Sequence, residues 1–236
     1  MHLFLLVWIW QQWNLKSLIG LLYLQSLLLK KKDVLDEESK IYLTKASEGA
    51  DRITALVNEL LDISQLEVGK GILNKSEVNA NKLVKDIIEE LGQAIKEKHL
   101  KTTVEIPSDI SLNVDSSKIR EAVTNLVDNA VKYNKDGGSI IINGAKFSHP
   151  IERKKQFFKL TIEDTGIGIP KEELSMLFNQ YFHRGKQAEK VYTTGRGIGL
   201  TLSKNIIQAH GGRIYVESEG EGRGSKFTIE LPLGNL

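Results

Sequence analysis

A seam of apolar side chains in the first third of the chain most constrains what it can fold into. Between residues 33 and 67 the pattern is helical, and apolar residues recur alternately three and four positions apart, at Leu43, Ala46, Ala50, Ile53, Val57 and Leu60. Leu56, Leu61 and Ile63 widen this face, which indicates a bundle of more than two helices. Because such a helix needs a partner, we expect residues 15–29 to pack against it as an antiparallel hairpin. Two hairpins would make a four-helix dimer, and a single intramolecular helical pair is the alternative.

The first 29 residues are apolar, but we do not expect them to span a membrane. A spanning helix needs about 20 consecutive apolar residues, and polar residues interrupt this run at Gln11, Gln12, Asn14 and Lys16. The start also lacks the basic residues and the small-residue cleavage site of a signal peptide. We therefore expect a cytoplasmic chain, associated with a membrane only if a longer protein carries an upstream sensor.

Composition excludes several kinds of partner and chemistry. The 236 residues carry a net charge of +2 with no dominant basic block, which argues against nucleic acid as the main partner. The chain has no cysteine, so disulfides, thiolate metal sites and thiolate nucleophiles are excluded, which fits a reducing compartment.

A change of pattern after Gly69 and Gly71 divides the chain into two domains. We expect a helical hairpin at residues 1–68 and a second domain at residues 72–236. Its expected strands are residues 72–78, 102–106, 111–114, 139–147, 157–163, 213–218 and 225–231, and its expected helices are residues 79–98, 116–133 and 199–210, with a short helix after Pro170. Helices and hairpin strands alternate in blocks. This predicts an α+β sandwich with a mixed, mostly antiparallel sheet and helices on one face.

The expected helix at residues 116–133 carries an unusual polar stripe. At 100° per residue, its polar members lie opposite an apolar face, and they are Glu121, Asn125, Asp128, Asn129 and Lys132. An ordinary solvated face is the alternative, but such faces favour Glu and Lys, and asparagine is a poor helix former. Two asparagines one turn apart offer amide oxygens to a hard cation and amide hydrogens to phosphate oxygens.

A second segment, EDTGIGIP at residues 163–170, follows an expected strand. Gly166 and Gly168 allow the backbone to turn sharply and approach a ligand, and Pro170 opens a helix. Asp164 would project from the strand end. Its carboxylate only accepts hydrogen bonds, so it suits the exocyclic amine of adenine and would reject the carbonyl of guanine. The alternative is a loop whose aspartate caps its own backbone.

A third segment, TTGRGIGL at residues 193–200, places Gly195, Gly197 and Gly199 before a helix. The free N–H groups and positive dipole end of that helix would receive phosphates. A dinucleotide fingerprint would need a strand directly before the glycines. The polar stretch at residues 183–192 precedes them instead, which favours a mobile lid closing over a nucleotide.

Together these segments resemble the ATP-binding domain of sensor histidine kinases, in the superfamily shared with gyrase, Hsp90-type chaperones and mismatch-repair ATPases. The matching motifs are NLVDNAVKY (125–133), DTGIGI (164–169), LFNQYF (177–182), GRGIGL (195–200) and GRGSKFTIELP (222–232). They occur in the family's order and spacing. The resemblance runs from about residue 73 to residue 233.

The resemblance implies a role for each matching residue. Asn129 would coordinate Mg²⁺, Asn125 would assist at the phosphates, Lys132 would contact phosphate, Tyr133 would lie against the nucleotide and Asp164 would hold the adenine amine. Gly166 and Gly168 would line the nucleotide, and Gly195, Gly197 and Gly199, with the neighbouring Leu200, would wrap the phosphates of ATP. Arg184 would neutralise charge on the γ-phosphoryl group, a role for which His183 competes. Arg196 is a further phosphate ligand, with solvent exposure as the alternative.

Asn125 separates a kinase from an ATPase. Gyrase-like relatives carry a glutamate at this position, one turn before the metal-binding asparagine, as the base for an attacking water. An amide takes no proton, so phosphoryl transfer to a protein side chain is favoured over hydrolysis.

The helix ending in NELLDISQLEVGK (58–70) is similar to the second helix of the family's dimerisation and phosphotransfer hairpin. The first helix should carry a phosphoacceptor histidine before a Leu-basic-Ser/Thr pattern. Leu15, Lys16 and Ser17 fit that pattern, but Trp13 stands at the place of the histidine, and counting back from Asp62 points to Gln11 instead. The five histidines do not replace it, and we expect ordinary structural roles for His99, His149 and His210.

The resulting hypothesis is a homodimeric histidine-kinase catalytic core that uses Mg²⁺ and ATP and passes its phosphoryl group to a response regulator receiver domain. The alternative is a non-catalytic ATP-binding pseudokinase or dimerisation module without its own phosphoacceptor histidine. The two differ in whether ATP leaves acid-labile label on the protein.

Overall fold

The computed structural model describes residues 36, 38–42, 44–45, 49, 73–148, 156–178 and 199–234. The chain divides into two compact units, Met1–Asp62 and Ile63–Leu236. The described residues of the first unit form helical turns, in which Lys40 N donates to Asp36 O at 3.0 Å and Thr44 Oγ1 donates to Lys40 O at 2.9 Å. All six seam residues, the hairpin partner, Trp13 and the expected boundary at residues 68–72 lie outside the described residues, so these expectations stay predictions.

A five-stranded sheet forms the centre of the second unit. Its strands are β2 (Lys101–Glu105), β4 (Ser139–Ser148), β5 (Gln156–Asp164), β7 (Ser225–Leu233) and β6 (Arg213–Glu217), in that spatial order. β2 runs parallel to β4, and the other neighbours are antiparallel. The predicted mixed, mostly antiparallel sheet is therefore confirmed. β1 (Lys75–Asn79) and β3 (Ser111–Asp115) form a separate antiparallel pair.

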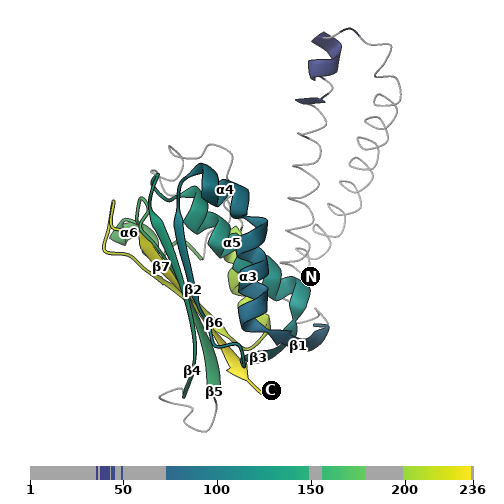
Figure 1. Cartoon of the computed structure of the whole chain (residues 1–236), viewed down its shortest axis with the longest axis vertical. Coiled ribbons are helices and arrows are strands. Elements are labelled where there is room, and N and C mark those ends of the chain that lie inside the picture. The colour runs from purple at the N-terminus through teal and green to yellow at the C-terminus, as the bar shows by residue number, and fades with distance from the viewer. Residues whose placement is uncertain are drawn as a thin grey trace, which may run out of the picture. The chain divides into compact units, whose positions relative to one another are not determined.

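The helices described in this unit are α3 (Ala80–Glu90), α4 (Gly92–Glu97), α5 (Ser116–Lys132) and α8 (Gly199–Ala209), with the short α6 (Lys171–Leu174) after Pro170. α3, α4 and α5 lie on one face of the large sheet, as Figure 1 shows, and α8 packs against α5. No helix in the described part of the chain is long and apolar enough to cross a membrane.

The core lies between the sheet and α5 and α8. Its members include Leu126, Val127, Ile140, Ile162, Ile206 and Ile207, each at most 1% exposed. The apolar face expected on α5 is confirmed, because its members are buried: Ile119, Ala122, Val123, Leu126, Val127 and Ala130. Burial of these side chains is the main term that stabilises the domain. It also fixes which face of α5 remains for the polar stripe.

One expected helix, residues 79–98, is two helices in the structure. α3 begins after Asn79, whose side chain accepts a hydrogen bond from Lys82 N at 2.9 Å and so caps the helix. The helix breaks at Leu91, which has φ −86° and ψ 2°, and α4 starts at Gly92. Glycine is a poor helix former, which explains the break.

Candidate nucleotide site

Asp164 ends β5 with a nearly buried side chain, 8% exposed. Its Oδ1 accepts from Gly166 N at 2.7 Å, and its Oδ2 accepts from Ser225 Oγ at 2.5 Å. Burial raises the pKa of this carboxyl, and the two hydrogen bonds oppose that rise. Two carboxylate oxygens offer about four acceptor positions. The side chain therefore caps its own backbone and still has acceptor capacity for a ligand amine.

The loop after Asp164 is held against the carboxyl end of α5. Ile167 N donates to Tyr133 O at 3.0 Å. A Cβ atom at Gly166 would lie 2.3 Å from that same carbonyl oxygen, so a residue with a side chain does not fit there. Gly166 thus lets two motifs that are about 30 residues apart in sequence meet in space.

The other side of this loop is bonded to the turn between β6 and β7. Gly222 N donates to Ile167 O at 2.6 Å, and Gly224 N donates to Gly166 O at 3.2 Å. Gly168 has φ +69°, and a Cβ there would lie 2.0 Å from Gly220 O. The Asp164 loop is therefore fixed by backbone contacts on both sides.

The stripe on α5 meets the start of α8. Asn125 Nδ2 donates to Ser203 Oγ at 3.0 Å, and a Cβ at Gly199 would lie 2.2 Å from Asn125 Oδ1. This contact brings the third glycine motif next to the first asparagine. Asn129, one turn further on, is half-buried and its amide makes no hydrogen bond to the described part of the chain.

Lys132 lies on the same stripe but is paired within its own helix. Its Nζ lies 2.5 Å from Asp128 Oδ2, with both side chains partly exposed. A phosphate contact by Lys132 would have to share or open this ion pair. The expected phosphate role stays a prediction.

The structure therefore brings some of the expected site residues together. Asp164 contacts Gly166, Gly166 contacts Tyr133, and Asn125 contacts Gly199. Leu200 follows Gly199 in α8 and is half-buried. The expected ligands Arg184, Gly195, Arg196 and Gly197, the competing His183 and the loop residue His149 lie outside the described residues.

Two residues of this region were not expected from the sequence. Ser225 contacts the Asp164 carboxylate because β5 and β7 pair with Asp164 opposite Ser225. Lys98 reaches from the end of α4 to the end of α5, where its Nζ donates to Val131 O at 3.0 Å and Lys132 O at 2.5 Å. A hydroxyl directly after Gly222–Gly224 was the only signal for Ser225, and Lys98 had none.

Two of the histidines for which ordinary structural roles are expected lie among the described residues. His210 is buried, its Nε2 accepts from Asp115 N at 2.9 Å and its Nδ1 donates to Ile206 O at 2.8 Å. His99 lies at the surface, where its Nδ1 is 2.9 Å from Asp136 Oδ1. These contacts tie helix and strand ends together.

Residues 114–235 match the family described as histidine kinase-, DNA gyrase B-, and HSP90-like ATPase. The match spans just over half of the chain and contains α5, the Asp164 loop and α8. The chain belongs to this family. Within it, the chain is similar to sensor histidine kinases, and the domain is a histidine-kinase-type ATP-binding domain.

Three curated relatives illustrate this similarity. Sensor protein GacS of Pseudomonas syringae pv. syringae is 33% identical over 207 residues, which cover 87% of this chain and 22% of GacS. Sensor histidine kinase WalK of Bacillus subtilis is 30% identical over 192 residues, 81% of this chain and 30% of WalK. Adaptive-response sensory kinase SasA of Synechococcus sp. (strain JA-3-3Ab) is 33% identical over 186 residues, 78% of this chain and 47% of SasA. The chain spans from about a fifth to about half of the length of these relatives.

Solved structures share the fold. Full-length ShkA in complex with AMPPNP has a TM-score of 0.68 at 23% identity, over 86% of this chain and 40% of ShkA. Acinetobacter baumannii histidine kinase AdeS has a TM-score of 0.64 at 23% identity, over 94% of this chain and 98% of AdeS. ThkA in complex with the response regulator protein TrrA has a TM-score of 0.61 at 22% identity, over 92% of this chain and 59% of that one.

Proposed function

We propose that this chain is the catalytic core of a two-component sensor histidine kinase. It binds Mg-ATP in its second unit and transfers the γ-phosphoryl group to a histidine, for relay to the receiver domain of a response regulator. The observation that carries the proposal is the buried carboxylate of Asp164, which is held by Gly166 N and Ser225 Oγ at the end of β5.

Asp164 is the adenine ligand in this proposal. Its side chain is 8% exposed and retains acceptor capacity beyond its two hydrogen bonds. Such a group accepts a hydrogen bond from the exocyclic amine of adenine, whereas the carbonyl of guanine would meet it lone pair to lone pair. Gly166 and Gly168 keep side chains out of the loop beside it, and Tyr133 lies at the adjoining end of α5.

Asn129 and Asn125 are the residues that would hold Mg²⁺ and the phosphates. The amide of Asn129 is half-buried and has no partner in the described part of the chain, so its oxygen fits a metal ligand. Mg²⁺ usually binds through few protein oxygens together with phosphates and waters. The ion would neutralise charge on the phosphates of ATP. Within the described ranges, no group of three or more His, Cys, Asp or Glu could hold a metal by itself.

Phosphoryl transfer, rather than hydrolysis, is favoured by the amide at Asn125. Its Nδ2 donates to Ser203 Oγ, and an amide cannot take a proton from water. Lys132, Arg184 and Arg196 would supply positive charge to the phosphates, and Gly195, Gly197, Gly199 and Leu200 would cover them as a lid. Of these lid glycines, Gly199 already lies against Asn125.

Residues 1–68 are proposed as a dimerisation and phosphotransfer hairpin, and residues 72–236 as the ATP-binding domain. The apolar seam supports a homodimer, because that face needs partner helices. A receiver-domain partner is supported by the fold shared with ThkA, which was solved with a response regulator protein. Trp13 stands at the expected place of the phosphorylated histidine, so a partner chain would supply that histidine if Trp13 replaces it.

Incubation with ATP labelled at the γ-phosphate tests the proposal. We expect the chain to bind Mg-ATP and to gain acid-labile, base-stable label when Trp13→His restores an imidazole at the expected position. The unmodified chain and the Trp13→His variant are also tested after addition of a kinase hairpin that carries the histidine. If both proteins bind ATP but no acid-labile label forms under any of these conditions, the non-catalytic module is favoured instead. A chain that binds no ATP would contradict both readings.

A further inference from the structure

Ser218 lies where the Asp164 loop meets the turn between β6 and β7. Its Oγ accepts hydrogen bonds from Ile169 N at 3.0 Å and Gly220 N at 3.3 Å, and it donates to Gly224 O at 2.7 Å. Gly220 O lies at 3.5 Å as a further acceptor. One hydroxyl therefore joins backbone groups of three residues, from two segments that are about 50 residues apart in sequence.

Both segments carry a contact of Asp164. Ile169 closes the loop that starts at Asp164, and Gly224 directly precedes Ser225, whose hydroxyl donates to Asp164 Oδ2. A Cβ at Gly224 would lie 1.9 Å from Asp164 O, so the two backbones are in direct contact there. A shift at Ser218 would thus move the groups on both sides of the carboxylate.

The turn has little stiffness of its own. Gly220, Gly222 and Gly224 all have positive φ, at 117°, 73° and 72°, and glycine is the residue with the most backbone freedom. Ser218 instead follows the last residue of β6, Glu217, which pairs with Lys226 in β7. The Ser218 hydroxyl therefore links the glycine-rich turn to the end of β6, which is held by its pairing with β7.

We propose that Ser218 is a positioning residue for adenine recognition. It does not touch the nucleotide, but it fixes the Asp164 carboxylate and the Ser225 hydroxyl in the arrangement that accepts the base. This inference rests on the proposed function, in which Asp164 is the adenine ligand. A binding side chain that is already held in its bound position increases affinity, because no conformational entropy is lost in ordering it when the nucleotide binds.

The test compares Ser218→Thr with Ser218→Val, which have nearly equal shape but differ in the hydroxyl. The dissociation constant for ATP is measured by displacement of a fluorescent ATP analogue, at a temperature where circular dichroism shows each variant folded. We expect Ser218→Thr to bind like the unmodified chain and Ser218→Val to bind about tenfold more weakly. Ser218→Ala should follow Ser218→Val, which provides a second variant without the hydroxyl.

Ser117→Ala is the matched control for stability. Its hydroxyl donates to Asp115 Oδ1 at 2.7 Å at the far end of α5, so its loss lowers stability without touching the site. We expect its thermal midpoint to fall while its affinity for ATP stays unchanged. A role of Ser218 in folding alone would give the same pattern for Ser218→Val, and that result would overturn the inference.

A double-mutant cycle with Ser225→Ala adds a readout of the coupling. If Ser218 acts through Ser225 and Asp164, the losses in ATP affinity of the two single variants will not add in the double variant. Full additivity would contradict the inference. Failure of the unmodified chain to bind ATP would instead contradict the proposed function, so the two failures are distinguishable.

Discussion

The amide oxygen of Asn125 lies where a side chain of Gly199 would begin, because a Cβ at Gly199 would be 2.2 Å from Asn125 Oδ1. The first residue of α8 is thereby fixed on the polar stripe of α5. Ser203, one turn further along α8, accepts from the same amide and extends the contact. The first turn of α8 and the candidate phosphate ligand Asn125 therefore pack directly against each other.

We predict that Gly199→Ala destabilises the domain by about 1–3 kcal/mol, because the added methyl group must displace Asn125 or the end of α8. ATP affinity should fall as well, since Asn125 would move. Urea unfolding and ATP titration measure both effects. Gly92→Ala is the control: a Cβ there meets nothing within 4 Å, and alanine favours a helix, so its stability should be unchanged or higher. Equal changes in stability and ATP affinity in the two variants would contradict a close contact between Gly199 and Asn125.

Lys98 should be important for stability rather than for chemistry. Its ammonium donates to the carbonyl oxygens of Val131, Lys132 and Asn134 at the end of α5, and burial lowers its pKa. We predict that Lys98→Met lowers the free energy of unfolding by about 1–3 kcal/mol, because these carbonyls lose a charged donor near the negative end of the helix dipole. The exposed Lys96→Met should change it by less than about 0.5 kcal/mol. Equal free energies of unfolding for the two variants in urea would show that Lys98 does not stabilise the end of α5.

His210 should make the domain less stable in mild acid. Burial lowers the pKa of His210 below its usual value of 6.5, and Lys75 lowers it further, while the hydrogen bond to Ile206 O and the charge of Asp115 raise it. The unfolded chain then binds a proton at a pH where the folded chain does not, so stability falls as pH drops below about 6.5. The stabilisation is fully present above that value.

Urea unfolding between pH 5.5 and 7.5 measures this dependence. His210→Gln keeps a polar group at the position but cannot take a proton, so its stability should vary less across this range. Because the pKa of Asp115 lies below its usual value, this carboxyl stays ionised between pH 5.5 and 7.5 in both proteins, and the difference between the two curves isolates His210. Parallel curves would show that His210 does not contribute.

Much of the fold follows from patterns that lie within single elements. The apolar face of α5 depends on local periodicity, so this helix and its buried face were predictable. The break at Leu91 was not, because only one glycine marks it and apolar residues continue beyond it.

The site was predictable only for residues that carry their own chemical signal. Asp164 stands out as a carboxylate in a glycine motif, and Asn125 and Asn129 stand out as amides on a helix stripe where Glu and Lys are more usual. Ser218 and Ser225 depend on which strands pair and in what register, and Lys98 depends on the approach of α4 to the end of α5. Serine in a turn and lysine at a helix end are ordinary and carry no signal of their own. A local sequence pattern does not show which distant segments pair, so it could not predict these contacts.

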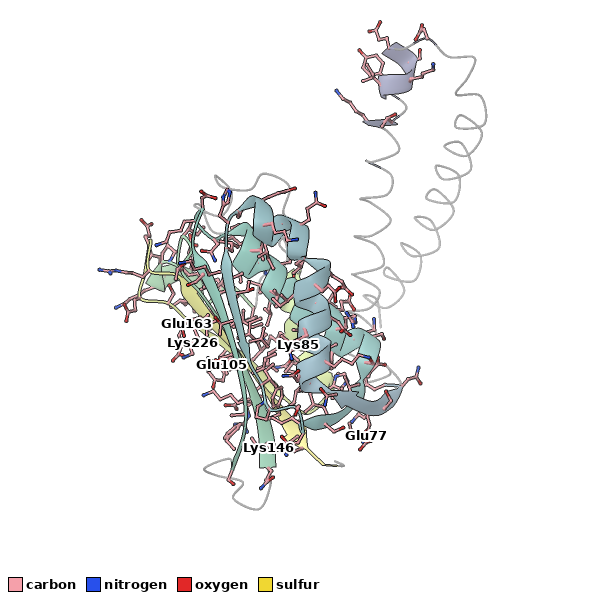
Figure 2. All side chains as sticks on the ribbon, viewed as in Figure 1. Glu77, Lys85, Glu105, Lys146, Glu163 and Lys226 are labelled. Atoms are coloured by element: carbon pink, nitrogen blue, oxygen red, sulfur yellow. The ribbon has the colours of Figure 1, made fainter. Side chains whose placement is uncertain are left out.

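Asp164→Asn tests the assignment of Asp164 as the adenine ligand. The amide would turn a donor toward the adenine amine and would lose one acceptor, while Gly166 N and Ser225 Oγ could still be paired. The control is the neighbouring Glu163→Gln, whose carboxylate is half-exposed and lies 3.5 Å from Lys226 Nζ, the two residues being labelled side by side on the sheet in Figure 2. We predict that Asp164→Asn weakens ATP binding at least about tenfold and that Glu163→Gln leaves it unchanged. A folded Asp164→Asn protein that binds ATP as tightly as the unmodified chain would contradict the account.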